Sequence, residues 1–199
     1  MSFGVGQHSL PWTDEDDHMA TSLGDLAPLE GVKRWAFVDR AMRLRLASAL
    51  PNGAINVSPA WFVVVDGTVY VPLDPTLGDP GQSTTPDARH MEIIDAGGRV
   101  SAVIDEGDEI SNVRAVQLEG TANRVDDPEL VEQLLDLVAE KYFHVGHPHL
   151  EYYFSAGAVA ARRWYRIIPE RVDGWDMREL PQPPIQELLR FPDHVVIGS

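Results

Sequence analysis

The sequence predicts a mainly β fold, a six-stranded antiparallel barrel with a few flanking helices. Short stretches of alternating apolar and polar residues recur along the chain, which is the pattern of half-buried strands. Glycine-containing turns separate several of these stretches, and segments with helical spacing are few. Strands joined by tight turns pair in antiparallel fashion, and a short series of them favours a small barrel.

The first three strands are expected in residues 43–72, which read RLRLASALPNGAINVSPAWFVVVDGTVYVP. Asn52-Gly53 and Asp66-Gly67 separate the apolar stretches of this segment. Both dipeptides are strong hairpin signals because the two central positions of such turns favour positive φ. The segment therefore predicts a three-stranded meander.

The middle strand of this meander contains Ser58, Pro59 and Trp61. A proline has no N–H to donate to a neighbouring strand, so this part of the strand is expected at a sheet edge or a bulge. An open edge beside a small polar residue and an aromatic ring is a surface on which a flat cofactor could lie.

Three further strands and several helical segments complete the expected fold. The strands are predicted at residues 99–105, 113–125 and 164–169, and Gly120 marks a bend or bulge in the second of them. Helical spacing predicts one or two helices over 23–42, with a break near 28–31, and one or two turns over 89–95 ended by Gly97-Gly98. Residues 150–161 fit a helix or a loop, and the Pro-, Gly-, Ser- and Thr-rich residues 73–88 predict a long loop.

The most strongly indicated helix begins after Asp127. Asp127 is a favoured N-cap residue, and Pro128 suits the first turn because its missing N–H would have no partner there. The apolar face of this helix consists of Leu130, Val131, Leu134, Leu135, Val138 and Tyr142.

The composition indicates one soluble globular domain in a chain of 199 residues. We expect a flexible acidic segment at 1–22, the barrel domain at 23–178 and an extended Pro-rich tail at 179–199 that lies over the surface or over a partner subunit. No apolar stretch approaches the roughly 20 residues of a membrane span, and no secretory signal pattern precedes the domain. A cytoplasmic protein without a membrane partner is therefore expected.

Several functional classes are disfavoured by residue usage. The formal net charge of −15 argues against a nucleic acid partner, and the absence of cysteine excludes disulfides, thiolate zinc sites and cysteine nucleophiles. No Ser-His-Asp signature, glycine-rich nucleotide loop or carboxylate pair with usable spacing supports a hydrolase or a kinase. His144, His147 and His149 have a spacing that could bind zinc or nickel, but three surface histidines are the simpler interpretation, and no metal is predicted.

Four segments of the chain carry a resemblance to a known family. They are RLAS with NGAINVSPAWF, then RVSAVID, then VQLEGTANRVDD, and finally WYRIIPERVDGWD. In this order they resemble the pyridoxamine 5′-phosphate oxidase-like split β-barrel proteins, and more narrowly the flavin/deazaflavin-dependent oxidoreductases. The resemblance covers roughly residues 32–176. It implies a homodimer of six-stranded barrels that binds flavin mononucleotide (FMN) or the deazaflavin coenzyme F-420 in a cleft between the subunits.

The resemblance also implies where that cofactor would bind. The second strand would run along the ring system, which assigns Val57, Ser58, Pro59, Ala60 and Trp61 to the site. Trp61 fits a wall of the cleft or, by alternation alone, a core aromatic. Trp175 resembles the packing aromatic near the family's C-terminal end.

The phosphate clamp of the family follows its third strand and contains a lysine ten residues before the valine that corresponds to Val100. That position is His90 here, or Arg89 with a one-residue gap, so both are candidate phosphate ligands. The preceding loop offers hydroxyl and amide groups, but its Asp79 and Asp87 would repel a phosphate. A relative that holds no cofactor is therefore an alternative.

Basic residues supply the remaining candidates. Lys33, Arg34, Arg40, Arg43 and Arg45 crowd into one segment, which could meet the anionic tail of coenzyme F-420 in an otherwise acidic chain. They equally fit a solvated surface. Arg162-Arg163 would serve the dimer interface or the cleft, or simply begin a strand in solvent.

The function that these observations predict is that of an oxidoreductase. A flavin or deazaflavin would carry hydride to or from a small organic substrate, while the protein supplies a shaped cleft and a phosphate clamp. The alternative is a split barrel that binds a small ligand without turnover, or one that uses no cofactor.

Overall fold

The computed structural model describes residues 27–50, 52–75, 85–143 and 146–180 of the chain. A seven-stranded antiparallel sheet dominates it, with the spatial order β2-β1-β5-β6-β7-β4-β3. The strands are β1 (Leu44–Ala49), β2 (Ile55–Ala60), β3 (Val63–Val65), β4 (Thr68–Leu73), β5 (Arg99–Glu106), β6 (Arg114–Val125) and β7 (Arg163–Asp176).

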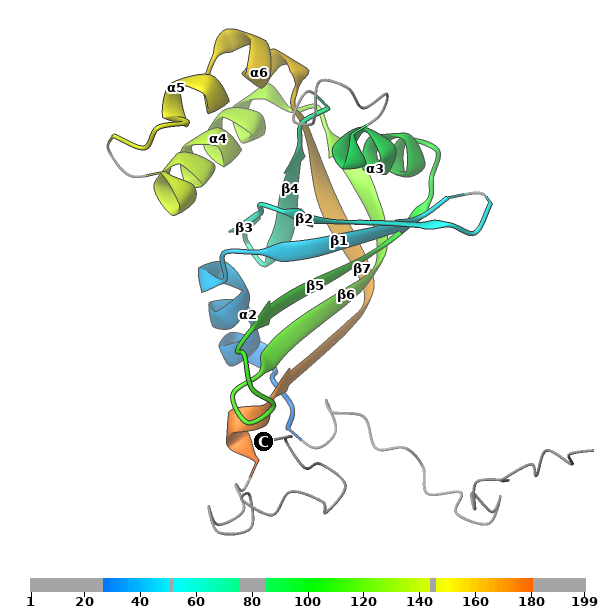
Figure 1. Ribbon diagram of the computed structural model, residues 1–199, viewed down its shortest axis with the longest axis vertical. Coiled ribbons are helices and arrows are strands. Elements are labelled where there is room, and N and C mark those ends of the chain that lie inside the picture. The colour runs from blue at the N-terminus through cyan, green and yellow to red at the C-terminus, as the bar shows by residue number, and fades with distance from the viewer. Residues whose placement is uncertain (1–26, 51, 76–84, 144–145, 181–199) are drawn as a thin grey trace, which may run out of the picture.

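The sheet is strongly curled, as Figure 1 shows. Its two edge strands, β2 and β3, follow each other directly in the chain, and β2 also contacts β4 from across the sheet. The curl brings the two edges toward each other, which is the arrangement of a split barrel. The predicted mainly β, antiparallel split-barrel fold is confirmed, with seven strands in place of six because one predicted strand is divided.

Helices cover the ends of the curled sheet (Figure 1). Helix α3 packs on β1 and β2, whereas α2 and α4 both contact β3. The helices are α2 (Gly31–Arg40), α3 (Pro86–Asp95), α4 (Pro128–Tyr142), α5 (Leu150–Tyr153) and α6 (Ala156–Ala161), followed by a 3₁₀ turn, η1 (Met177–Glu179). No helix within these described ranges is long and apolar enough to cross a membrane.

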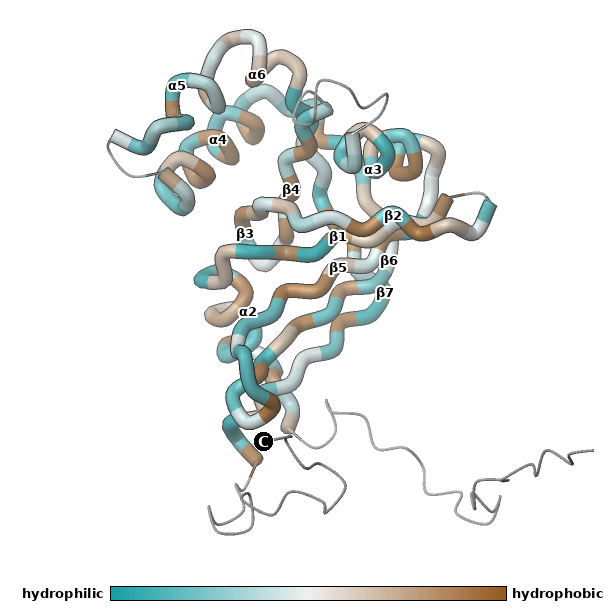
Figure 2. Tube along the Cα trace, in the orientation of Figure 1, coloured by the Kyte–Doolittle hydropathy of each residue, from teal (hydrophilic) through white to brown (hydrophobic). Residues whose placement is uncertain are grey.

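Apolar residues alternate with polar ones along the strands, as the hydropathy colouring of Figure 2 shows. The alternation places one face of each strand inside the curl and forms the main core. Its largest fully buried members are Phe37, Leu44, Leu46, Phe62, Leu73, Ile104, Leu118 and Tyr165. A second cluster lies under α4 and includes Leu134, Val138, Tyr153 and Trp164, with the rest of the predicted apolar face of α4 packed against it.

The hairpin predictions are confirmed. Gly53 and Gly67 both have positive φ, and Asp66 is the only described non-glycine residue with positive φ. Strand β2 lies at an edge of the sheet, as expected from Pro59. The register of β6 against β7 shifts between Glu119 and Gly120, which confirms the predicted bulge.

The prediction of one continuous middle strand in the meander is wrong. The strand ends at Ala60, and the separate strand β3 begins at Val63. Tyr142 explains the break, because its hydroxyl donates to the carbonyl oxygen of Phe62 at 2.9 Å and accepts from the N–H of Phe62 at 3.0 Å. A side chain from α4 thus satisfies the backbone groups that a continuous strand would pair. Trp61 lies just beyond the end of β2.

Two other boundaries differ from the prediction. Helix α3 begins at Pro86, inside the predicted loop at 73–88, because the Thr85 side chain accepts from the N–H of Ala88 and caps it. Strand β7 continues past Pro169 to Asp176, since β6 is long enough to pair with all of it. The ambiguous residues 150–161 form the short helices α5 and α6. The predicted acidic segment at 1–22 and most of the Pro-rich tail lie outside the described residues.

Candidate functional site

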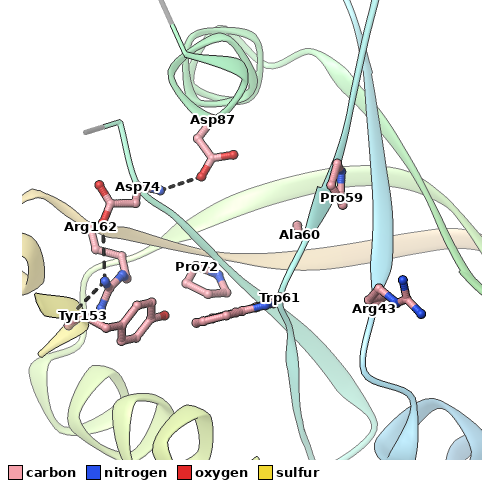
Figure 3. Close-up of a pocket in the computed structure, with 9 residues that line it drawn as sticks. All are labelled: Arg43, Pro59, Ala60, Trp61, Pro72, Asp74, Asp87, Tyr153 and Arg162. Carbon is pink, nitrogen blue, oxygen red and sulfur yellow. Dashed lines mark hydrogen bonds and ion pairs between the residues drawn. The ribbon is translucent and has the colours of Figure 1, made fainter. Parts of the chain in front are cut away.

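A cavity of about 260 Å³ lies at the end of β2. Nine residues line it (Figure 3), and they come from β2, β4, α3 and α5 and from the segments that adjoin β1, β2, β4 and β7. They are Arg43, Pro59, Ala60, Trp61, Pro72, Asp74, Asp87, Tyr153 and Arg162.

One side of this cavity is apolar. Pro59 and Ala60 end β2, and Pro72 lies on β4 opposite them. The indole of Trp61 stacks on the ring of Tyr142, with 4.8 Å between ring centroids and 10° between planes, and it also contacts the ring of Tyr153. Trp61 therefore belongs both to the cavity wall and to an aromatic cluster that holds it in place.

The other end of the cavity is polar and deeply buried. The Arg162 guanidinium lies at the start of β7, and its Nη2 donates to the carboxylate of Asp74 at 3.4 Å and to the backbone carbonyl of Tyr153 at 3.1 Å. Both side chains of the ion pair are almost inaccessible, at 1% and 3% exposed. The guanidinium also stacks over the Tyr153 ring, 3.5 Å from its centroid.

Asp87 faces the same end from the first turn of α3 (Figure 3). Its Oδ2 accepts from the backbone N–H of Asp74 at 2.9 Å. Burial raises the pKa of the Asp87 carboxyl, and the charge of Asp74 adds to this effect, although the hydrogen bond from the Asp74 N–H opposes it. Burial likewise raises the pKa of the Tyr153 hydroxyl, which keeps its proton at neutral pH.

Buried donors remain unsatisfied at this polar end. Nε and Nη1 of Arg162 and the hydroxyl of Tyr153 have no hydrogen-bond partner in the part of the chain that the structure describes. Leaving a buried donor unpaired costs on the order of 1–3 kcal/mol. An unpaired group of this kind is common where a ligand is meant to complete the hydrogen bonding.

The residues predicted on the second strand differ in whether they line the cavity. Pro59, Ala60 and Trp61 line the cavity. Val57 is 59% exposed on the same face of the strand as Pro59, and it does not line the cavity. Ser58 is buried and does not line the cavity.

The two predicted phosphate ligands also divide. His90 is fully buried, and its ring bridges two strands: Nδ1 lies 2.8 Å from Ser48 Oγ and Nε2 lies 3.1 Å from Ser58 Oγ. Burial lowers its pKa to about 4, so the imidazole is neutral and neither ring nitrogen is open to a phosphate. Arg89 is exposed on α3, does not line the cavity and makes no ion pair with a described residue.

Most of the basic cluster has partners elsewhere. Arg45 pairs with Asp105, Lys33 with Glu179 at 3.6 Å, and Arg163 with Asp95 at 3.2 Å. Arg34 and Arg40 donate to the backbone carbonyl oxygens of Leu29 and Ala36. Arg43 lines the cavity.

The predicted histidine group is only partly described, since His144 lies outside the described residues. The rings of His147 and His149 have centroids 5.8 Å apart, and Nδ1 of His147 accepts from the backbone N–H of His149. Across the described ranges, no group of three or more His, Asp or Glu residues is arranged to hold a metal ion.

Two polar residues of the cavity were not predicted as site residues. Asp74 follows β4 directly and Tyr153 lies on the short helix α5, and neither has a recognisable motif around it. Asp87 was expected only to repel a phosphate. Arg162 was one of several candidates, and its place in the cavity depends on tertiary contacts.

A curled antiparallel half-barrel with a cavity against its β2 edge defines a split β-barrel protein. The family model described as pyridoxamine 5′-phosphate oxidase matches residues 35–176. The chain therefore belongs to the pyridoxamine 5′-phosphate oxidase-like family. None of the curated proteins compared with the chain matches it.

Solved structures of low sequence identity share the fold. The chain is similar to the conserved hypothetical protein Rv2991 from Mycobacterium tuberculosis, with 22% identity, a TM-score of 0.61 and coverage of 80% of this chain and 93% of that one. It is also similar to HutZ, a heme storage protein from Vibrio cholerae (19% identity, TM-score 0.53, coverage 72% and 94%). A third similar structure is an FAD-binding protein from Mesorhizobium loti (19% identity, TM-score 0.50, coverage 73% and 92%).

Proposed function

We propose that this protein is a flavin- or deazaflavin-dependent oxidoreductase whose cofactor ring lies against the β2 edge. Membership of the pyridoxamine 5′-phosphate oxidase-like family supports a flavin-related role. The single observation that carries the location is the cavity formed by Pro59, Ala60 and Trp61, because it lies on the strand edge where the sequence placed a flat cofactor.

The residues of the cavity suit the ring part of such a cofactor. Pro59 and Ala60 offer the ring an apolar surface at the end of β2, and the unpaired donors of Arg162 and Tyr153 at the polar end offer partners for substrate oxygens. When bound, the cofactor supplies hydride transfer to or from a small organic substrate. The protein's own part is to hold ring and substrate in register and to keep water away from them.

The phosphate of the cofactor would need cations that His90 does not supply. Exposed Arg43 lines the cavity and exposed Arg89 lies at the predicted clamp, and neither forms an ion pair with a described residue. We propose Arg89 as the phosphate ligand of FMN or of coenzyme F-420, in agreement with the spacing from Val100 when a one-residue gap is allowed.

A second copy of the chain would complete the site. The cavity of about 260 Å³ is smaller than the roughly 300–1,000 Å³ of typical small-molecule sites. Ile55 and Val57 are 69% and 59% exposed on the open strand β2, and apolar side chains on an open edge favour pairing with another protein surface. We propose a homodimer in which this face meets the partner beside the cofactor.

The test is a cofactor titration of the purified protein. A yellow protein, or saturable binding of FMN or coenzyme F-420 with turnover of an enone substrate, supports the proposal. The identity of the cofactor follows from which titration saturates at lower concentration. A colourless protein with no affinity for either cofactor would overturn the proposal.

The occupied ring of His90 favours a second candidate function, a split barrel that binds a small ligand without a phosphate-bearing cofactor. The same titration separates the two, because this candidate predicts no binding of FMN or coenzyme F-420. A sizing experiment with multi-angle light scattering tests the dimer separately.

A further inference from the structure

The polar end of the cavity presents donors to whatever binds there. Nε and Nη1 of Arg162 and the Tyr153 hydroxyl are buried and lack partners within the described residues. In Figure 3 the Tyr153 hydroxyl points along the cavity toward Trp61 and Pro72. Donors at one end of a cavity call for a ligand group that only accepts hydrogen bonds, which means a carboxylate, a phosphate or a carbonyl oxygen.

The charge of Arg162 selects among these groups. Its contact with Asp74 is 3.4 Å, which is longer than the roughly 2.7–2.9 Å of a strong charge-assisted hydrogen bond. Asp74 therefore compensates the buried positive charge of Arg162 only in part. A neutral carbonyl oxygen would add no negative charge to complete this compensation. A phosphate dianion would face the carboxylates of Asp74 and Asp87 at close range, which disfavours it.

We propose that this end of the cavity binds the carboxylate of a small organic acid, with Arg162 and Tyr153 as the hydrogen-bond donors. The carbon skeleton of the acid would lie along Trp61 and Pro72, which favours an aryl or unsaturated acid. Only the assignment of this acid as the enzyme's substrate rests on the proposed function. Its binding can be measured without any cofactor.

Binding of the acid is coupled to uptake of a proton. Asp87 faces the site from α3, and the other charged or titratable groups that line the cavity are Asp74 just after β4, Arg162 just before β7, Tyr153 on α5 and, at the far side, Arg43 before β1. Burial already favours the protonated form of Asp87, and a bound carboxylate adds a second negative charge beside it. The protonated Asp87 then donates to the ligand, so affinity rises as pH falls.

The experiment is calorimetric titration of the cofactor-free protein with three probes of similar shape: cinnamate, cinnamamide and phenyl phosphate. Cinnamate is expected to bind at least tenfold more tightly than either of the others at pH 7. Its affinity is expected to rise several-fold between pH 8 and pH 6. Equal binding of cinnamamide, tighter binding of phenyl phosphate, or no binding of cinnamate at any pH in this range would overturn the proposal.

Variants locate the site. Arg162→Gln should weaken cinnamate binding at least tenfold, whereas Arg163→Gln, at an exposed neighbour paired with Asp95, should leave it unchanged. Because Arg162→Gln disturbs a buried ion pair, Asp87→Asn serves as a second variant, and it should make cinnamate affinity independent of pH between 6 and 8. Unchanged pH dependence in Asp87→Asn would contradict the proposal. Failure of the cofactor proposal is seen separately, as no binding of FMN or coenzyme F-420 to a protein that still binds cinnamate.

Discussion

Two buried polar clusters near β2 differ in whether their hydrogen bonds are complete. In the first, the His90 ring uses both nitrogens, one with Ser48 and one with Ser58. In the second, Arg162 and Tyr153 keep donors that no described residue accepts. The first cluster ties α3 to β1 and β2 and does not line the cavity beside Trp61, whereas the second does.

The comparison teaches how to separate structural polar groups from ligand-binding ones. A buried network with every donor and acceptor paired stabilises one arrangement of the chain. A buried cluster with unpaired donors beside a cavity carries a cost that a group bound in the cavity removes. The predictions below test this distinction, beginning with the largest expected effect.

The largest effect is expected from truncating Arg162. Arg162→Ala should lower the free energy of unfolding by about 3–5 kcal/mol, because it leaves the buried carboxylate of Asp74 without its cation. Urea denaturation at pH 7 measures this loss. The double variant Arg162→Ala/Asp74→Asn should recover part of it, and equal stability of the single and double variants would show that the ion pair is not what the variant disrupts.

The His90 cluster should produce a pH-dependent stability. The folded-state pKa of His90 is about 4, below its unfolded value near 6.5, so the unfolded chain binds the extra proton. The contribution is complete above pH 6.5 and is lost as pH falls from 6.5 toward 4, by up to about 3 kcal/mol. Urea denaturation of the wild type and of His90→Gln across this range isolates the effect, because the slope should disappear in the variant. If the free energy of unfolding has the same pH dependence in both proteins, that dependence comes from the carboxylates and not from His90.

The break between β2 and β3 should depend on the Tyr142 hydroxyl. Tyr142→Phe removes both hydrogen bonds to the backbone of Phe62 and should cost about 1–3 kcal/mol. Tyr152→Phe is the matched control, because Tyr152 is 53% exposed, and its stability should stay within about 0.5 kcal/mol of the wild type. Equal melting temperatures for the two variants would rule out this account of the break.

The smallest effect has the opposite sign. The Lys141 ammonium is buried over the Phe62 ring at 3.9 Å and has no hydrogen-bond partner among the described residues. Burial lowers its pKa to about 8, so carrying the charge at pH 7 opposes folding. Lys141→Met should therefore raise the free energy of unfolding at pH 7 by about 1 kcal/mol. Lys33→Met, at an exposed lysine, should change it little, and a less stable Lys141→Met protein would contradict this interpretation.

The parts of the fold that local chemistry determines could be predicted from the sequence. The turns at Asn52-Gly53 and Asp66-Gly67, the edge position of Pro59 and the bulge at Gly120 each depend on a residue's own backbone preference. The division of the second strand could not be predicted, because the hydroxyl that causes it belongs to Tyr142, 80 residues away. The start of α3 had a local signal in Thr85-Pro86, but the surrounding Pro- and Ser-rich sequence favoured a loop.

Only the cavity residues that lie at the end of β2 could be predicted from the sequence. Pro59, Ala60 and Trp61 were predicted to bind a cofactor, and they line the cavity because they lie at the end of the edge strand β2; their role in binding stays a prediction. Asp74 and Arg162 are 88 positions apart and meet only through the pairing of β4 with β7. His90 matched a clamp position by spacing, and spacing carries no information about whether a ring is buried.

The measurement that tests the central claim most directly is cofactor binding to a protein whose cavity has been filled. Ala60→Trp places an indole in the cavity beside Trp61, and Ala36→Trp, on the exposed face of α2, is the control. Titration of FMN and of coenzyme F-420, followed by cofactor fluorescence, should show saturable binding of one of them to the wild type and to Ala36→Trp. Affinity should be at least tenfold weaker for Ala60→Trp. Equal affinity in all three proteins would place the cofactor elsewhere and contradict the account.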